Sequence, residues 1–323
     1  MRPTLTKEKS FPNINQGYNK VFKPGQLSIG LVVPLESYPT GPIPSMSRHI
    51  ERIQLAEKLG FASVWLRDVP FNVPNFGDAG QLFDPFVYLG ALAVSTSDIA
   101  LGVSSIILPL RHPAHVAKAA SSLDQLSNGR LILGVASGDR PDEYPAINIP
   151  FALRGEYFRE SYDYIRQMDK DFPFFSNAFG TVNGDIDMLP KPYGSQLPLL
   201  ITGASQQSID WIAENGDGWM TYPRPTQTQE NEIKKLRETI QAKGGFDKPV
   251  MEPCYIDLTE SPDTPPSPIH LGLRLGVNEL GKYLRSRRKI GVNHIALNLR
   301  FNSVGIEETL QRLATEILPE FNS

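Results

Sequence analysis

The chain has 323 residues, a formal net charge of −3 and a single cysteine, Cys254. The small net charge argues against nucleic acid or an anionic membrane surface as a partner. One cysteine excludes an internal disulfide framework and is typical of a reducing compartment. The chain lacks an apolar run of about 18 residues, the length that a membrane-spanning helix needs. We therefore expect a cytoplasmic protein.

The first 26 residues contain no apolar segment of the kind found in secretory signals. We interpret residues 1–26 as an extended N-terminal arm, with a disordered tail as the alternative. Residues 27–323 then form one folded domain, because neither an internal repeat nor a linker interrupts them.

The first half of this domain alternates apolar runs with amphipathic segments. The apolar runs are too continuous to face water on either side, which is typical of buried parallel strands. Strands are predicted over residues 27–33, 63–66, 99–110 and 130–135. Helices are predicted over residues 46–59, from Asp84-Pro85 onward, and from His112-Pro113 to Asn128-Gly129.

The second half continues the same alternation. Strands are predicted over residues 199–202, 218–222, 250–258 and 294–299, and helices over 156–169, 206–214, around 233–240, 271–288 and 306–317. Residues 172–197 read as a loop with short strands, and residues 259–270 as a proline-dense loop that we expect to act as a lid.

About eight strand–helix units result, which is the number that closes a TIM barrel. The predicted fold is therefore an α/β (β/α)8 barrel with an N-terminal arm and loop insertions at its carboxyl-terminal face. The competing fold is an open doubly wound sheet. It would normally bring a glycine-rich fingerprint after the first strand, and residues 30–37 contain none.

Two glycine-containing turns follow predicted strands, where barrels carry their functional residues. The turn after the fifth strand places small residues at a helix start, where backbone N–H groups can bind an anion; it consists of Thr202, Gly203, Ala204, Ser205, Gln206 and Gln207. The alternative is an ordinary helix cap by Ser205. The turn after the fourth strand contains Ser137, Gly138 and Arg140, with a plain turn and a surface Asp139–Arg140 pair as its alternative.

The string SSIILPLRHPAHVAKAASSLDQLSNGRLILGVASG, residues 104–138, resembles the third and fourth strands of the bacterial luciferase-like, flavin-dependent oxidoreductases. The segments RDVPF, FGDAGQ, TGASQQS and DGWMTYPRP are similar to an uncharacterised luciferase-type branch of that family. The resemblance extends from about residue 27 to the C-terminus.

The resemblance implies a flavin site. In the family, the turn at residues 202–207 holds the flavin phosphate, and a non-proline cis peptide at Ser104–Ser105 forms a bulge against the flavin ring. The alternative for Ser104 and Ser105 is a regular strand with two small core residues. Luciferases place a phosphate-binding arginine where Ser137 stands here, so Arg140 is a candidate replacement.

The resemblance also implies an activity, in which FMN reduced by a separate flavin reductase reacts with oxygen and a small organic substrate is oxygenated. Luciferases carry a catalytic histidine where this chain has Val69-Pro70, and neither residue transfers protons. We therefore do not expect light emission from a long-chain aldehyde, and no general acid or base is assigned. Candidate substrate-binding residues are Arg67, Asp68, His112, Arg224 and His270.

Three other functions stay open. The chain could transfer hydride with a deazaflavin coenzyme, bind flavin without catalysis, or be a glycoside hydrolase that uses Asp68 and Asp139 as its carboxylate pair. His112 and His115 have helical spacing, but no third ligand joins them, so no metal site is predicted.

We also expect a homodimer, since family members commonly pair through the second and third helices of the barrel. Small residues on these helices permit close approach; they are Gly90, Ala91, Ala93, Ala117, Ala119, Ala120 and Ser121.

Overall fold

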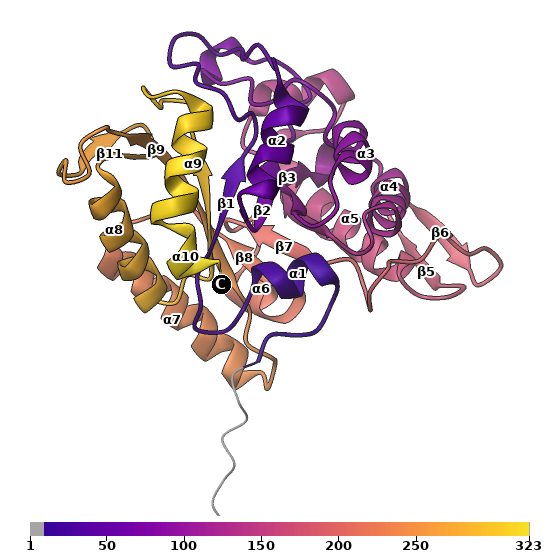
Figure 1. Ribbon diagram of the computed structural model, residues 1–323. Helices are drawn as coiled ribbons and strands as arrows, with labels where there is room; N and C mark the ends of the chain where they lie inside the picture. The colour runs from indigo at the N-terminus through magenta and orange to yellow at the C-terminus, as the bar shows by residue number, and fades with distance from the viewer. Residues whose placement is uncertain (1–9, 323) are drawn as a thin grey trace, which may run out of the picture.

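The structure, a computed structural model, describes residues 10–322 (Figure 1). Its core is a closed barrel of parallel strands, in which β12 pairs with β1 and β8 pairs with β9. The barrel strands are β1 (Ser28–Val32), β2 (Ser63–Leu66), β3 (Ala100–Ile107), β4 (Leu131–Ala136), β7 (Leu199–Thr202), β8 (Gly218–Met220), β9 (Val250–Leu258) and β12 (His294–Asn298). The predicted TIM barrel is confirmed.

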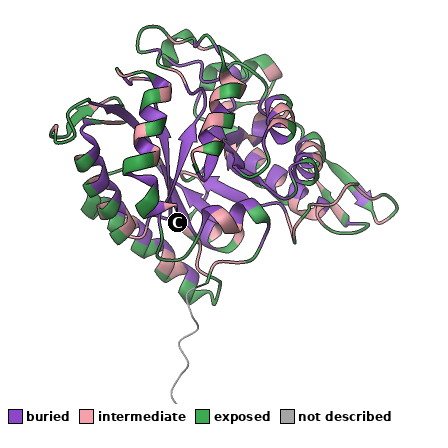
Figure 2. Ribbon diagram, viewed as in Figure 1, coloured by how far each residue is buried: buried purple, intermediate pink, exposed green. Residues whose placement is uncertain are grey.

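Helices surround the barrel, with apolar faces buried against the strands and polar faces exposed (Figure 2). They are α2 (His49–Lys58), α3 (Pro85–Ser95), α4 (Pro113–Leu126), α5 (Arg154–Met168), α6 (Ile209–Asn215), α7 (Thr226–Ala242), α8 (Val277–Lys289), α9 (Ile306–Glu316) and α10 (Leu318–Phe321). The predicted Asp-Pro start is confirmed, because the Asp84 side chain caps α3 by accepting the N–H groups of Phe86 and Val87. Within residues 10–322, no helix is long and apolar enough to cross a membrane.

The lower half of the barrel interior is filled around Trp65, whose side chain is fully buried. Its indole ring needs the space left by a glycine on the neighbouring strand, since a Cβ added to Gly102 would lie 2.2 Å from the ring. The barrel is therefore a packed core below its mouth, and its functional residues are expected at the carboxyl end.

The arm contains a helix, α1 (Gln16–Val21), where we expected extended chain. Asn15 caps this helix, and Tyr18 is fully buried in the cluster that fills the barrel interior. The Tyr18 hydroxyl also donates to the Asp217 carbonyl over 2.7 Å. Residues 10–26 thus close the amino end of the barrel.

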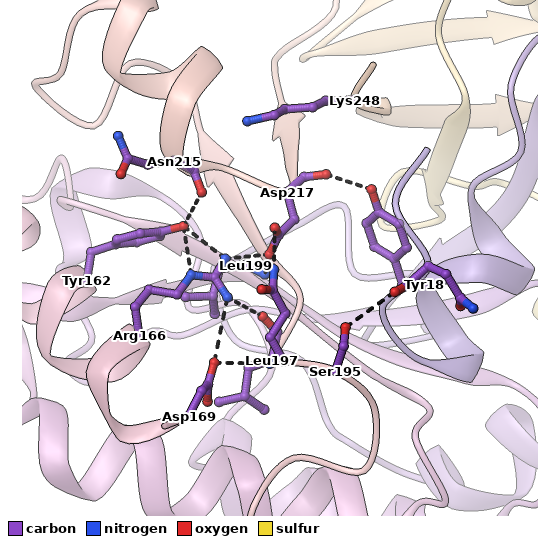
Figure 3. Close-up of polar contacts among 12 residues, drawn as sticks. Tyr18, Tyr162, Arg166, Asp169, Ser195, Leu197, Leu199, Asn215, Asp217 and Lys248 are labelled. Carbon is purple, nitrogen blue, oxygen red and sulfur yellow. Dashed lines mark hydrogen bonds and ion pairs between the residues drawn. The ribbon is translucent and has the colours of Figure 1, made fainter. Parts of the chain in front are cut away.

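A polar network near this end joins α5 to the loops before β7 and β8 (Figure 3). Arg166 donates to the Leu197 carbonyl over 2.6 Å and forms an ion pair with Asp217. The Asp217 carboxylate also accepts the N–H of Leu199 over 2.8 Å. Because these contacts fix the base of β7, they support the turn at its other end.

Short elements occupy the connections. The predicted short strands between α5 and β7 are β5 (Phe174–Asn177) and β6 (Gly180–Asn183), a hairpin that projects from the barrel (Figure 1). Residues 259–276 were expected to be a loop followed by helix, and that prediction is wrong in part. They contain the hairpin of β10 (Ser267–Ile269) and β11 (Gly272–Leu275), and β11 pairs with β9. The carboxyl-end loops also carry the 3-10 turns η1 (Pro74–Phe76), η2 (Leu108–Leu110), η3 (Pro141–Glu143), η4 (Pro145–Ile147) and η5 (Phe151–Leu153).

Candidate functional site

A cavity of about 280 Å³ opens at the carboxyl end of the barrel. Its walls come from the ends of β2, β3, β4, β7 and β8 and from the loops that follow them. Predicted cofactor residues that line it are Ser104, Ser105, Ser137, Gly138, Arg140, Thr202, Gly203, Ala204, Ser205 and Gln206. The topology therefore brings together residues from three distant turns of the sequence.

The cavity wall over β3 is interrupted by a backbone irregularity. The peptide bond between Ser104 and Ser105 is cis, as the family resemblance implied, and the pairing of β3 with β4 shifts register between Val103 and Ile106. The Ser105 hydroxyl forms a hydrogen bond with the Thr202 hydroxyl. This bond connects the irregularity directly to the start of the turn after β7.

The turn after β7 presents several backbone N–H groups without acceptors. Gly203, Ser205 and Gln206 have positive φ angles of +57°, +46° and +61°. The Gly203 N–H donates to Met220 and the Gln207 N–H to Ala204, both over 2.8 Å. The amides of residues 204–206 find no acceptor among residues 10–322. Successive amides without acceptors in a turn are suited to bind an anion.

The alternative reading of this turn, a helix cap by Ser205, is wrong. The Ser205 hydroxyl donates to the Thr202 carbonyl over 2.7 Å. Helix α6 begins at Ile209, and its cap is Ser208, which accepts the N–H of Trp211. The turn is therefore longer than expected, and the amides of residues 204–206 precede the helix.

Gln207 is not among the residues that line the cavity. Its side-chain oxygen accepts two hydrogen bonds from Arg159, and its amide nitrogen donates to the carbonyls of Gly155 and Ser205. Gln207 thus supports the turn by tying it to α5.

The loop after β4 forms the adjoining wall, because β4 pairs with β7. Gly138 has a φ of +78°, and a Cβ there would lie 2.6 Å from the Tyr144 hydroxyl. Arg140 turns toward the loop after β2, where its guanidinium lies 4.0 Å from the centre of the Phe76 ring and donates to the Asp78 carbonyl over 3.4 Å. These contacts lie on the β2 side of the cavity, which argues against Arg140 as the replacement for the missing phosphate-binding arginine.

Arg67 and Asp68 line the cavity but pair with different residues. Arg67 donates to Asp78 over 2.5 Å, and Arg300 lies 3.0 Å from the same Asp78 oxygen. Burial raises the pKa of Asp78, but the two arginines and the Gly80 N–H outweigh it and hold that pKa below its usual range. Arg67 and Asp68 do not pair with each other, since Arg111 binds Asp68.

Three candidate substrate residues lie outside the cavity lining. His112 caps α4 by accepting the Ala114 N–H over 3.3 Å. Arg224 is exposed and donates to the Thr221 hydroxyl over 2.5 Å, and His270 is exposed. Their proposed contact with substrate is not supported by this geometry.

Sequence reasoning missed several lining residues, among them Phe76, Glu143 and Tyr222. Glu143 is 3% exposed, and burial raises its pKa to about 7, against the opposing effect of Arg140. The segment around Glu143 shows no periodic pattern, so only its position after β4 could have indicated a site.

The fold and the site together define a TIM-barrel protein with a cavity at the carboxyl end of its strands, lined in part by a turn whose amides at residues 204–206 have no acceptor among residues 10–322. The model of the luciferase-like monooxygenase family matches residues 27–260, and the chain belongs to that family. The family consists of oxidoreductases, as the resemblance implied.

Two relatives illustrate the likeness in sequence. An uncharacterized protein of Mycobacterium tuberculosis is 31% identical over 218 residues, which cover 60% of this chain and 73% of the relative. The alkanal monooxygenase beta chain of Photorhabdus luminescens is 28% identical over 210 residues, covering 63% and 61% respectively.

Solved structures share the fold at lower identity. The monooxygenase RslO1 from Streptomyces bottropensis superposes with a TM-score of 0.75 at 20% identity, over 90% of this chain and 99% of that one. An F420-dependent secondary alcohol dehydrogenase has a TM-score of 0.73 at 20% identity, over 90% and 98%.

Proposed function

We propose that the protein is a monooxygenase that uses reduced FMN and oxygen to oxidise a small organic substrate. The observation that carries this proposal is the turn at residues 202–207. Its amides without acceptors lie next to the Ser104–Ser105 irregularity, on one cavity. An anion site at this turn, next to the β3 backbone at Ser104–Ser105, suits a planar cofactor that carries a phosphate.

The residues present fit FMN. The amides of residues 204–206 would hold its phosphate, and Gly203 leaves open space beside them, since a Cβ there would have no atom within 4 Å. When bound, reduced FMN supplies the electrons that activate oxygen. The chain's part is to bind the cofactor, to exclude water with Val69, Phe76 and Ile107, and to position the substrate.

Three further elements belong to the proposal. A separate flavin reductase supplies the reduced cofactor, as the family resemblance implies. The protein acts as a homodimer in the cytoplasm. The glycoside hydrolase alternative is disfavoured, since Asp68 is bound to Arg111 and offers no free carboxylate to pair with Asp139.

A titration with three cofactors tests the proposal. FMN, riboflavin and the deazaflavin coenzyme F420 are added to the protein, and binding is followed by flavin absorbance and fluorescence. We expect FMN to bind at least about tenfold more tightly than riboflavin, because hydrogen bonds to a charged group contribute about 1.5–3 kcal/mol. Oxygen uptake with reduced FMN and a panel of small substrates then tests catalysis.

The other possible results of this titration favour other functions. Tighter binding of F420 with no oxygen uptake would favour hydride transfer, the activity of the alcohol dehydrogenase that shares this fold. FMN binding without turnover of any substrate would favour a flavin-binding protein. Failure to bind either cofactor would overturn the proposal.

A further inference from the structure

One edge of the Arg67 guanidinium is open to the cavity. Arg67 directly follows β2 and lines the cavity, and its side chain is 19% exposed. Its Nη1 donates to Asp78 over 2.5 Å. Nε and Nη2 have no acceptor among residues 10–322, and neither atom is fully enclosed by those residues. Two neighbouring N–H donors are therefore available to a ligand.

The Arg67 side chain is held in place from several sides. Asp78, its partner, also accepts the Gly80 N–H over 2.8 Å and lies 3.0 Å from the Arg300 guanidinium. The Gln81 side chain donates to the Arg67 carbonyl over 2.8 Å. A Cβ added to Gly80 would lie 3.6 Å from the central carbon of the Arg67 guanidinium, so the loop after β2 packs against it. The open edge is thus oriented before a ligand binds, which lowers the cost of binding.

Positive charge exceeds negative charge in this wall of the cavity. Arg67 and Arg300 share Asp78, and Arg140 pairs with Glu143, so three guanidinium groups meet two carboxyl groups. Burial lowers the pKa of Arg140, and the positive charge of Arg67 lowers it further. Burial raises the pKa of Glu143 to about 7, against the opposing effect of Arg140, so near neutral pH this carboxyl is only partly ionised. The wall therefore attracts an anion.

The other carboxylates that line the cavity do not compensate this charge. Asp68 is held by Arg111. Asp139 is exposed and forms no ion pair within residues 10–322. The open edge of Arg67 thus receives no counter-ion from the described part of the chain.

The geometry of the open edge fits a carboxylate. The Nε and Nη2 donors of an arginine match the two oxygens of a carboxylate in a bidentate pair. A primary amide of the same shape offers a single neutral acceptor. Close to Arg67, the cavity is lined by the apolar side chains of Val69, Phe76 and Ile107.

We propose that Arg67 binds a carboxylate of the substrate through its Nε–Nη2 edge. The substrate class is a small carboxylic acid, whose apolar part lies against Val69, Phe76 and Ile107. This inference rests on the proposed function, because it names the substrate class for the same cavity.

The matched probes benzoate and benzamide test the inference, since they have nearly the same shape and differ in charge. Benzoate should bind the FMN-loaded protein about tenfold to a hundredfold more tightly than benzamide, because it accepts two hydrogen bonds from a charged group. Calorimetric titration at pH 7.5 measures both affinities.

Variants assign the preference to Arg67. Arg67→Gln removes the open edge but leaves Asp78 with Arg300 and the Gly80 N–H, so it should fold and bind both probes equally. Arg67→Lys keeps a charge beside Asp78 but has no second edge, so it should lose most of the preference. Arg285→Gln is the matched control, because Arg285 is an exposed, ion-paired residue of α8, and it should behave as the wild type. Circular dichroism confirms that each variant is folded.

Several results would overturn the inference: equal affinities for the two probes, a preference that persists in Arg67→Gln or in full in Arg67→Lys, or no binding of either probe at millimolar concentration. FMN affinity should be unchanged in Arg67→Gln. If this variant weakens FMN and benzoate alike, the open edge serves the cofactor and the inference is wrong.

The same titrations in the absence of FMN separate the two proposals. A preference for benzoate in a protein that does not bind FMN removes the proposed cofactor only. FMN binding without a preference for benzoate removes this inference only.

Discussion

Arg111 holds the carboxylate of Asp68 through two hydrogen bonds, of 2.7 Å from Nη2 and 3.0 Å from Nε. The Asp68 side chain is 1% exposed, and it also accepts the Ile107 N–H over 3.1 Å. Asp68 therefore ties the end of β2 to the end of β3. Its role is to position the cavity wall, and its charge is already compensated before any ligand enters.

We predict that Asp68→Asn lowers the free energy of unfolding by about 3 kcal/mol, because it leaves a half-buried guanidinium without its main partner. Urea unfolding measures this change. Asp98→Asn is the control, since Asp98 is 67% exposed and its ion pair with Lys20 should contribute less than about 1 kcal/mol. If Asp68→Asn is as stable as the wild type but no longer binds substrate, then Asp68 contacts the substrate and does not only position the cavity wall.

The second prediction concerns Gly203, in the turn at residues 202–207 that we propose holds the FMN phosphate. Gly203→Ala places a methyl group in open space beside the amides of residues 204–206, where the phosphate would lie. FMN affinity should fall at least about tenfold, whereas riboflavin affinity should change little. Fluorescence titration with both ligands measures the contrast.

The control for Gly203→Ala is Gly244→Ala. Gly244 also has a positive φ, of +71°, and open space around it, but it follows α7. Both substitutions carry the same backbone strain, of about 1 kcal/mol, so only loss of the phosphate site separates them. Ser205→Ala should have a small effect, because its hydroxyl is engaged with the Thr202 carbonyl. Equal losses for FMN and riboflavin in Gly203→Ala would refute the phosphate site.

Local patterns were sufficient to predict the barrel. The strands β2, β7 and β9 begin and end as predicted, because β2 and β7 are short apolar runs and β9 alternates along its length. The hairpin of β10 and β11 was missed because it is short and its first strand contains Pro268. Helix α1 was missed because its six residues give too little periodicity.

The candidate site was predictable only where one turn supplies it. The turn at residues 202–207 is contiguous, so its glycine and small residues were visible in the sequence. Asp68 and Arg111 are 43 residues apart, and no local pattern indicates that they pair. The position of Arg140 over the Phe76 ring likewise depends on how η3 is placed against the loop after β2.

The third prediction concerns the expected homodimer. Four of the seven small residues proposed for the interface, including Ala93 and Ala120, are buried. On α3, however, Val87 and Val94 are 74% and 76% exposed, and they lie on one helix face with Gly90 and Ala91 between them. This apolar stripe is the surface that we expect a second copy to cover.

We expect light scattering at micromolar concentration to give a dimer for the wild type and a monomer for the double variant Val87→Lys, Val94→Lys. Phe246→Lys is the control, because Phe246 is 62% exposed after α7, and it should stay dimeric. A wild-type monomer would remove the dimer from the proposal.

The last prediction concerns His294, which lies fully buried inside the barrel. The Trp65 indole donates to His294 Nε2 over 2.9 Å, so this nitrogen carries no proton. Ser28 donates to the Val21 carbonyl, and its oxygen is left to accept from Nδ1 over 2.7 Å. A second proton on the fully buried ring would face the indole N–H.

Burial accordingly lowers the pKa of His294 to about 3, from 6.5 in the unfolded chain. Below pH 6.5 the unfolded state binds a proton that the folded state does not, so stability falls as pH falls from 6.5 toward 3. The contribution of this one group is at most about 1.4 kcal/mol per pH unit.

Urea unfolding from pH 8 to pH 4.5 measures how steeply the free energy of unfolding depends on pH. His294→Gln can still accept from Trp65, so it should fold and lose this part of the slope. His115→Gln, at an exposed histidine, should keep it. Equal slopes in wild type and His294→Gln would show that His294 does not resist protonation in the folded protein.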